Sequence, residues 1–324
     1  MKKITSSLLS TLAITTYMTA HCIDTYHSIA PLDQPATYTY VQLITPTRGD
    51  LAHDGSNPIT ISESGVYRLT DNMTGDGSST LITISASNVE LDLDDHTIDT
   101  CTNGIIITGT TVRIKNGTIQ NGSTSGISIS GDTCTLENVD ILDTPIGYSL
   151  SSANYCSLTN CRALDCTNIG FSLATSSHNL CKACQASNIG SSTTVAGFSS
   201  ANGSANNFES CNTTNFYTNV HSSAAEASGF KIDTETSSSV INCTVNGASS
   251  TSELPELYGI TFVSTTSCIA KDNVVANVSG GAGAIGFAIP DNTTGNLMID
   301  NVAYANDTNY APPAGDSSNK SFAD

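Results

Sequence analysis

The stretches GIIITGTTVRIKNGTIQN, at residues 104–121, and GISISGDTCTLENVDILD, at residues 126–143, are two copies of one unit. Each copy opens with a glycine and an alternating apolar pair, and further copies follow between residue 81 and the region of residue 310. The glycine and the residue after it form aligned columns: Gly104–Ile105, Gly126–Ile127, Gly147–Tyr148, Gly170–Phe171, Gly197–Phe198, Gly229–Phe230, Gly259–Ile260 and Gly286–Phe287. A repeat of roughly twenty to thirty residues is typical of a solenoid, whose stacked coils bury a shared core.

Four more columns run through the same repeat. The first is mostly asparagine, as expected at a tight bend: Asp95, Asn116, Asn138, Asn160, Ala183, Ser210, Asn242, Asn273 and Asn301. The residues one and three positions later are mostly apolar and should face inward; the second of these columns reads Ile98, Ile119, Ile141, Ala163, Ala186, Thr213, Val245, Ala276 and Tyr304. The residues just before the bend are mostly polar and should face outward. Alternation with a period of two predicts β-strands, and the missing helices predict parallel coils about 4.8 Å apart.

The segments ITISESGVYRLTDNMTG, at residues 59–75, and LITISASNVELDLDDHTI, at residues 81–98, resemble the start of bacterial right-handed β-helix repeat proteins. These belong to the superfamily that includes pectate lyases and polygalacturonases, and the resemblance runs from about Ile59 to Asn306. It implies an all-β fold: a single-stranded right-handed parallel β-helix, or solenoid, of about nine coils with an N-terminal cap. It implies no single activity, because lyases, hydrolases, epimerases, tailspikes and adhesins share this scaffold.

We expect four segments along the chain. Residues 1–20, with two lysines before a mildly apolar stretch, have the layout of a signal peptide. Residues 21–80 should form an N-terminal segment that caps the open core, residues 81–310 the β-helix, and residues 311–324 a loose tail. The predicted location is therefore secreted, periplasmic or at the cell surface.

The charge of the chain restricts its partners. With 11 Lys and Arg against 29 Asp and Glu, the net charge is -18, which disfavours nucleic acid. Beyond the signal peptide, no stretch reaches the roughly eighteen apolar residues of a membrane span. Neutral glycans or surface proteins are the expected partners, and no cofactor is expected.

The eleven cysteines fall mostly into inward columns. Cys161, Cys184, Cys211 and Cys243 share one column, and Cys134 and Cys156 share another. In-register neighbours keep their Cβ atoms near the strand spacing of about 4.8 Å, which is longer than a relaxed disulfide needs. We therefore expect free thiols that pack as small hydrophobes, and no metal site.

The coils lengthen on one side only, between the asparagine column and the next glycine, in the C-terminal half. Extra length in a solenoid often marks the binding face. The lengthened segments, expected as loops, supply the candidate ligand-binding residues Phe216, Tyr217 and Tyr258 and the candidate catalytic residues His221, Glu226, Glu253 and Glu256.

Three functions remain open at this point. The first is a secreted module that binds glycan or protein through this long-loop face, with exposed aromatic side chains. The second is a polysaccharide-cleaving enzyme, a hydrolase more than a lyase, in which Glu226 and either Glu253 or Glu256 form a carboxylate pair about 5–9.5 Å apart. The third is a structural spacer or coat protein without a ligand.

Overall fold

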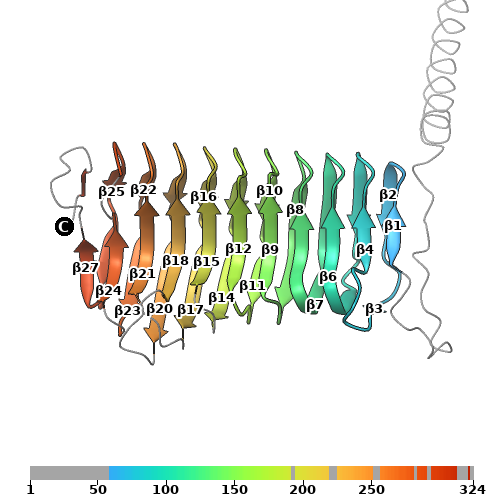
Figure 1. Ribbon diagram of the computed structural model, residues 1–324, viewed down its shortest axis with the longest axis horizontal. Coiled ribbons are helices and arrows are strands. Elements are labelled where there is room, and N and C mark those ends of the chain that lie inside the picture. Colours follow the sequence, from blue (N-terminus) through green and yellow to red (C-terminus); the bar gives the residue numbers. More distant parts are fainter. Residues whose placement is uncertain are drawn as a thin grey trace, which may run out of the picture.

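The computed structural model describes residues 58–190, 194–218, 225–250, 256–280, 283–289, 293–311 and 320–321. The secondary structure of these residues consists of β-strands, and none of them forms an α-helix. The strands stand side by side in a row, so this part of the chain is a rod with β1 near one end and β27 near the other (Figure 1). Within this part, accordingly, no helix is long and apolar enough to cross a membrane.

Three parallel sheets run along the rod, and each coil contributes one strand to each of them. Sheet one contains β1 (Ile59–Ile61), β4 (Ile82–Ile84), β9 (Ile146–Ser151), β12 (Ile169–Ala174), β15 (Thr194–Ala201), β18 (Glu226–Asp233), β21 (Glu256–Val263), β24 (Gly283–Ala288) and β27 (Thr308–Ala311). Sheet two contains β2 (Gly65–Arg68), β5 (Val89–Asp92), β10 (Ser157–Thr159), β13 (Leu180–Lys182), β16 (Asn207–Glu209), β19 (Ser239–Ile241), β22 (Ile269–Lys271), β25 (Leu297–Ile299) and β28 (Lys320–Ser321).

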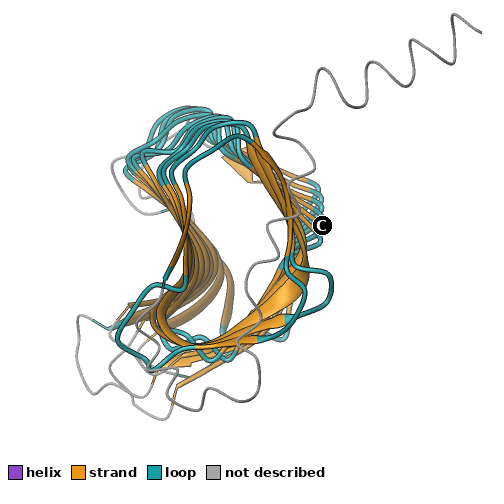
Figure 2. Ribbon diagram, turned by 90° about the vertical axis from the view of Figure 1, so that its right-hand side faces the viewer, coloured by secondary structure: helices purple, strands orange, loops and turns teal. Residues whose placement is uncertain are grey.

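Sheet three contains β3 (Met73–Thr74), β11 (Arg162–Leu164), β14 (Gln185–Gly190), β17 (Asn212–Thr218), β20 (Thr244–Ser250), β23 (Val274–Val278) and β26 (Val302–Tyr304). Three long strands follow the chain around bends from one sheet to the next: β6 (Thr97–Ile107), β7 (Val112–Ile129) and β8 (Thr135–Leu142). Viewed along the rod, the coils superimpose on one curved outline (Figure 2). The predicted parallel β-helix of about nine coils is therefore confirmed.

The β-helix begins earlier than residue 81. The strands β1, β2 and β3 already form a coil, and β1 pairs in register with β4. Residues 58–80, expected as part of a cap, thus belong to the solenoid. The predicted signal peptide and the rest of the expected cap lie outside the described residues, as does most of the expected tail.

The predicted interior stack is continuous. Its residues pair in register from coil to coil and none has more than 1% of its surface exposed: Ile105, Ile127, Tyr148, Phe171, Phe198, Phe230, Ile260 and Phe287. The rings of Tyr148, Phe171 and Phe198 stack with centroids 4.6 Å apart. Burial of each such side chain stabilises the fold by about 1.5–3 kcal/mol.

The glycine column has a steric cause. Sheets one and three converge beside it, and a Cβ atom on Gly229 would lie 2.7 Å from a methyl group of Val245. Real Cβ contacts are longer than this, so a side chain here would push the two sheets apart.

The predicted asparagine column is wrong by one position in its last two coils. Ile241 pairs with Lys271, and Lys271 pairs with Ile299, so the bend continues from Asn242 to Asp272 and Asp300. These three residues have φ angles of 53°, 55° and 50°. Asn273 and Asn301 therefore lie one position further on, inside the core, in the column of Cys243.

Tyr304 is misplaced for the same reason. Ala303 takes the inward position that the shifted alignment gave to Tyr304, and Tyr304 is 54% exposed. Asparagine serves here both as an outer bend residue and as an inner hydrogen-bonding residue, so its identity alone does not reveal its register.

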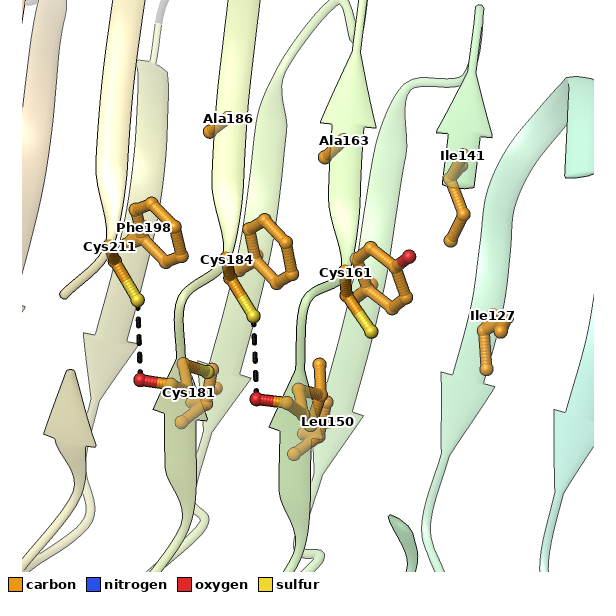
Figure 3. Packing of buried hydrophobic residues seen from close by; sticks show 14 of the residues in the cluster. Ile127, Ile141, Leu150, Cys161, Ala163, Cys181, Cys184, Ala186, Phe198 and Cys211 are labelled. Atoms are coloured by element: carbon orange, nitrogen blue, oxygen red, sulfur yellow. Dashed lines mark hydrogen bonds between the residues drawn. The ribbon is translucent and has the colours of Figure 1, made fainter. Parts of the chain in front are cut away.

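The ten cysteines that the structure describes are free thiols, and all are buried. Burial raises the pKa of Cys101, Cys166 and Cys268 to about 11. The cysteines are more than small hydrophobes, because their thiols form hydrogen bonds between coils. The Sγ atoms of Cys184 and Cys211 lie 3.4 Å and 3.2 Å from the carbonyl oxygens of Leu158 and Cys181 (Figure 3).

Candidate functional site

Polar and aromatic side chains gather on the outer face of sheet one, on β18 and β21. Glu226 pairs in register with Glu256, and Ser228 pairs with Tyr258. Ala227, Phe230 and Leu257 alternate with these residues and are buried in the core, so the polar set faces outward. We use the name outer-face cluster for five residues: Glu226, Ser228, Lys231, Glu256 and Tyr258.

The Glu226 carboxylate is held on both oxygens. Ser228 donates a 2.9 Å hydrogen bond to Oε1, and Lys231 donates a 2.6 Å hydrogen bond to Oε2. The side chains of Lys231 and Glu226 are only 18% and 21% exposed, so this ion pair is better shielded from water than most surface pairs. The three side chains therefore form a fixed polar surface.

On the neighbouring strand, Tyr258 donates a 2.7 Å hydrogen bond to Oε2 of Glu256. Burial, the hydrogen bond to Glu256, and the negative charges of Glu256 and Glu226 raise the pKa of Tyr258 above its ordinary value. The phenol therefore stays protonated at neutral pH and acts as a donor.

Thr261 adds an unsatisfied group beside the cluster. It pairs in register with Lys231, alternates with the inward residues Ile260 and Phe262, and is fully buried. Among the described residues, its Oγ1 atom has no hydrogen-bond partner. A buried hydroxyl without a partner is costly, so Thr261 is a point of local instability beneath the cluster.

The predicted site residues lie in different parts of the structure. The fold brings Glu226, Glu256 and Tyr258 together, although they lie on strands rather than in loops. Tyr217 lies on β17 in sheet three and is half-buried, with its ring against Gly190 of the preceding coil. His221 and Glu253 lie outside the described residues.

The expectation that Phe216 contacts a ligand is wrong, because Phe216 is fully buried. The sheet-three strands continue past a second bend, at which Asn188 and Asn215 adopt φ angles of 56° and 53°. Phe216 follows this bend and pairs with the buried residues Ile189 and Ala248 of the adjacent coils. It is therefore part of the core.

The sequence reasoning missed Ser228, Lys231 and Thr261. The sequence carries a signal for Lys231 and Thr261, because each directly follows a residue of the inward column, Phe230 or Ile260, on the same sheet as Glu226.

A second polar group was also missed, and it lies inside the solenoid. Glu235 is 1% exposed. Its carboxylate accepts hydrogen bonds from the Ser200 hydroxyl at 2.8 Å, the Gly203 amide at 3.0 Å and the Ser238 hydroxyl at 2.7 Å, with Asn206 Nδ2 at 3.3 Å. Burial raises the pKa of Glu235, while these hydrogen bonds oppose the rise.

The residues around Glu235 make room for it. Ser200 replaces the leucine of the preceding coil, Leu173, and a Cβ atom on Gly203 would lie 2.9 Å from Glu235 Oε1. Because the carboxylate is enclosed by its own coil neighbours, we assign it a structural role. Elsewhere, no three His, Cys, Asp or Glu side chains of the described residues are grouped in a way that would hold a metal ion.

Comparisons with known proteins agree with this architecture. The model of a family described as "Right handed beta helix region" matches residues 80–223. No curated protein matches the sequence.

Solved structures of several β-helix proteins are similar in fold. Dettilon tailspike protein is 11% identical, with a TM-score of 0.41 over 77% of this chain and 59% of that chain, so this chain spans less than two thirds of the tailspike. The surface adhesin PfbA of Streptococcus pneumoniae is 9% identical, with a TM-score of 0.40 over 75% of this chain and 81% of that chain. The endo-xylogalacturonan hydrolase of Aspergillus tubingensis is 10% identical, with a TM-score of 0.41 over 78% and 86%. These likenesses concern the fold and carry no activity over to this chain.

Proposed function

We propose that this protein is a secreted or cell-surface glycan-binding module and that the outer-face cluster on β18 and β21 contacts the sugar. The observation that carries the proposal is the arrangement of Glu226, Lys231, Glu256 and Tyr258 on one outer sheet face, with Glu226 held by the buried Ser228 hydroxyl and by Lys231. The expected signal peptide and the negative net charge support an exported protein whose ligand is not an anionic polymer.

The chemistry of the cluster suits a neutral sugar. A binding site combines an apolar surface with a few polar groups that fix the orientation of the ligand. The Tyr258 ring supplies the apolar surface, the carboxylates accept hydrogen bonds from sugar hydroxyls, and Lys231 donates them. The buried Ser228 hydroxyl holds Glu226 in place from beneath.

Polysaccharide hydrolysis is the second candidate, and the register of Glu226 with Glu256 favours it. Neighbouring strands lie about 4.8 Å apart, close to the carboxyl separation of about 5–5.5 Å in retaining glycosidases. Against it, both carboxylates accept hydrogen bonds from neighbouring donors, and Glu226 is ion-paired. A general acid instead needs a protonated carboxyl group in an apolar setting. We therefore rank binding above catalysis.

The first experiment measures glycan binding. The protein is applied to an array of neutral and anionic oligosaccharides, and the affinity for each bound sugar is measured for Tyr258→Ala, Tyr258→Phe and Lys231→Met. We expect at least a tenfold loss with Tyr258→Ala and with Lys231→Met, and a smaller loss with Tyr258→Phe, which keeps the ring. Tyr304→Ala is the matched control, because Tyr304 is an exposed tyrosine on sheet three. Equal binding by the parent protein and Tyr258→Ala would refute the proposal.

The second experiment separates binding from hydrolysis. Each bound oligosaccharide is incubated with the parent protein, with Glu226→Gln and with Glu256→Gln, and new reducing ends are counted. A binder releases none. If the parent protein releases reducing ends and both glutamine variants bind without turnover, the hydrolase is correct and our ranking is wrong.

A further inference from the structure

A second aromatic feature lies at the bend between sheet one and sheet two, away from the outer-face cluster. Several residues of this bend have positive φ angles. Those nearest the sheet-two strand form one column: Asn88, Thr111, Thr133, Tyr155, His178, Ala205, Ser237, Ser267 and Gly295. Tyr155 follows β9 and His178 follows β12, whereas the cluster lies on β18 and β21. The two features are thus separated along the rod and also lie at different points of the coil.

The fold does not require aromatic residues in this column. Tyr155 and His178 have φ angles of 58° and 60°, a backbone conformation that is unfavourable for residues with large side chains. The other members of the column are small or polar. Tyr155 is 61% exposed and His178 is also exposed, so neither contributes to the core. Two rings are therefore held outside the core at positions where alanine and serine also occur.

The two rings form a rigid ledge. Their centroids lie 4.8 Å apart and their planes differ by 21°, so the rings stack on each other. In the next coil the column continues with Ala205, whose methyl group covers much less area than a ring. The ledge therefore ends at His178, and the outer part of the His178 ring is not covered by a third aromatic ring.

Polar side chains flank the ledge. The residue before each column member is Asn154, Ser177 or Ser204 in the three coils concerned. These side chains are partly exposed and hydrogen-bond along the rod: Asn154 Oδ1 accepts from the Ser177 amide at 2.9 Å, and Ser204 donates to Ser177 Oγ at 3.2 Å. Amide and hydroxyl groups thus lie beside an apolar ring surface.

We propose that the Tyr155–His178 ledge is a binding site for an uncharged sugar ring. One face of a pyranose carries C–H groups that pack on an aromatic ring, while its hydroxyls need hydrogen-bond partners such as the Asn154 amide and the Ser177 and Ser204 hydroxyls. No lysine or arginine belongs to the column or its flank, which excludes an anionic sugar as the preferred ligand.

The test follows His178 directly. Resonances of the histidine imidazoles are recorded by NMR during titration with cellohexaose, laminarihexaose and mannohexaose, with hexagalacturonate as the anionic comparison. The His178 signals are assigned by their absence in His178→Ala. We expect at least one neutral hexasaccharide to shift the His178 signals, and Tyr155→Ala to weaken that binding at least tenfold. Tyr155→Phe keeps the ring and should bind like the parent protein.

Two controls make the outcome decisive. Ala205 occupies the same backbone conformation in the native chain, so alanine variants at 155 and 178 should fold, which their circular dichroism will verify. The titration is repeated in Tyr258→Ala, where the outer-face cluster is damaged and the His178 response should persist. His178 signals that do not move with any neutral hexasaccharide, or equal affinities of Tyr155→Ala and the parent protein, would overturn the ledge without bearing on the cluster.

Discussion

The inward bend column is built differently in its middle and at its C-terminal end. Its middle coils carry Cys161, Cys184, Cys211 and Cys243, and its last coils carry Asn273 and Asn301. Both kinds of side chain make the same bonds. Cys243 Sγ lies 3.4 Å from the carbonyl oxygen of Phe208, and Asn273 Nδ2 lies 2.9 Å from the carbonyl oxygen of Val240, the equivalent position one coil later.

The two side chains also accept hydrogen bonds from equivalent backbone amides of successive coils. The amide of Cys211 donates to Cys243 Sγ at 3.3 Å, and the amide of Cys243 donates to Asn273 Oδ1 at 2.8 Å. A buried backbone group needs a partner, and at this bend the partner must come from the side chain of the next coil. A small side chain that both donates and accepts can make both bonds, and asparagine and cysteine do so with different strength. We call these side chains amide rungs and thiol rungs.

The largest expected effect comes from removing an amide rung. Asn273→Leu preserves the approximate volume but leaves the Cys243 amide without its partner and removes a donor from the Val240 carbonyl and from Asn301 Oδ1. Each unsatisfied buried group costs about 1–3 kcal/mol, so we expect the free energy of unfolding to fall by about 2–5 kcal/mol. Urea denaturation followed by circular dichroism measures this change.

The matched control for this variant is Asn242→Gly. Asn242 is the exposed neighbour on the outer side of the same bend, and glycine tolerates its positive φ angle. Its loss should change the free energy of unfolding by only about 0.5 kcal/mol. If the two variants are equally stable, the inner amide is not a structural rung.

The second prediction concerns the rate of thiol modification. Thiol rungs can be modified by a disulfide reagent, and amide rungs cannot. The thiolate is the reactive form, and burial raises the pKa of Cys161 and Cys211, two of the thiol rungs, well above its ordinary value. We expect native thiols to react with a disulfide reagent on the order of a hundredfold more slowly than in denaturant. Rapid reaction of several thiols in the folded protein would contradict the buried column.

Removing a thiol rung should cost less than removing an amide rung. Val139 occupies the same column one coil before Cys161, so the column accommodates valine. Cys243→Val deprives the Cys211 amide and the Phe208 carbonyl of a sulfur partner. Sulfur is a weak donor and acceptor, so we expect a loss of about 1 kcal/mol in urea denaturation. A loss as large as that of Asn273→Leu would show that the two kinds of rung are equivalent.

Much of this fold could be predicted from the sequence, because each coil must repeat the same inward positions. The repeat alone predicts the glycine column from Gly104 to Gly286 and the stack of apolar and aromatic residues beside it. The register failed at Asn273 because an asparagine can satisfy either the outer bend or the inner rung. Only the pairing of Ile241, Lys271 and Ile299 distinguishes the two.

The candidate site was predicted less completely. The lengthening of the coils predicts Glu226, Glu256 and Tyr258 as site residues, and the structure places them on adjacent strands of one sheet. Phe216 was misplaced because the strand continues after a second bend, which coil length alone does not reveal. Tyr155 and His178 escaped notice because their column contains mostly small residues, and their stacking depends on two coils that are distant in sequence.

The smallest expected effect concerns the buried carboxylate of Glu235. It lies outside the column of amide and thiol rungs and accepts hydrogen bonds from Asn206 and Ser238. Its pKa is raised by burial, so the folded state binds its proton more tightly than the unfolded state does. Its contribution to stability is therefore complete below the unfolded pKa and declines as the pH rises through the folded pKa.

Glu235→Gln cannot lose a proton, and its amide can still accept from Gly203 and meet the Ser238 hydroxyl. Since many other carboxylates titrate, the useful quantity is the difference in unfolding free energy between the parent protein and Glu235→Gln, measured by urea denaturation from pH 4 to pH 8. This difference should shift in favour of Glu235→Gln as the pH rises, by less than the cost of losing an amide rung. Ser238→Ala removes a donor to the carboxylate and should move the decline to higher pH. A difference that stays constant across this range, or that changes in favour of the parent protein, would mean that the surrounding donors outweigh burial.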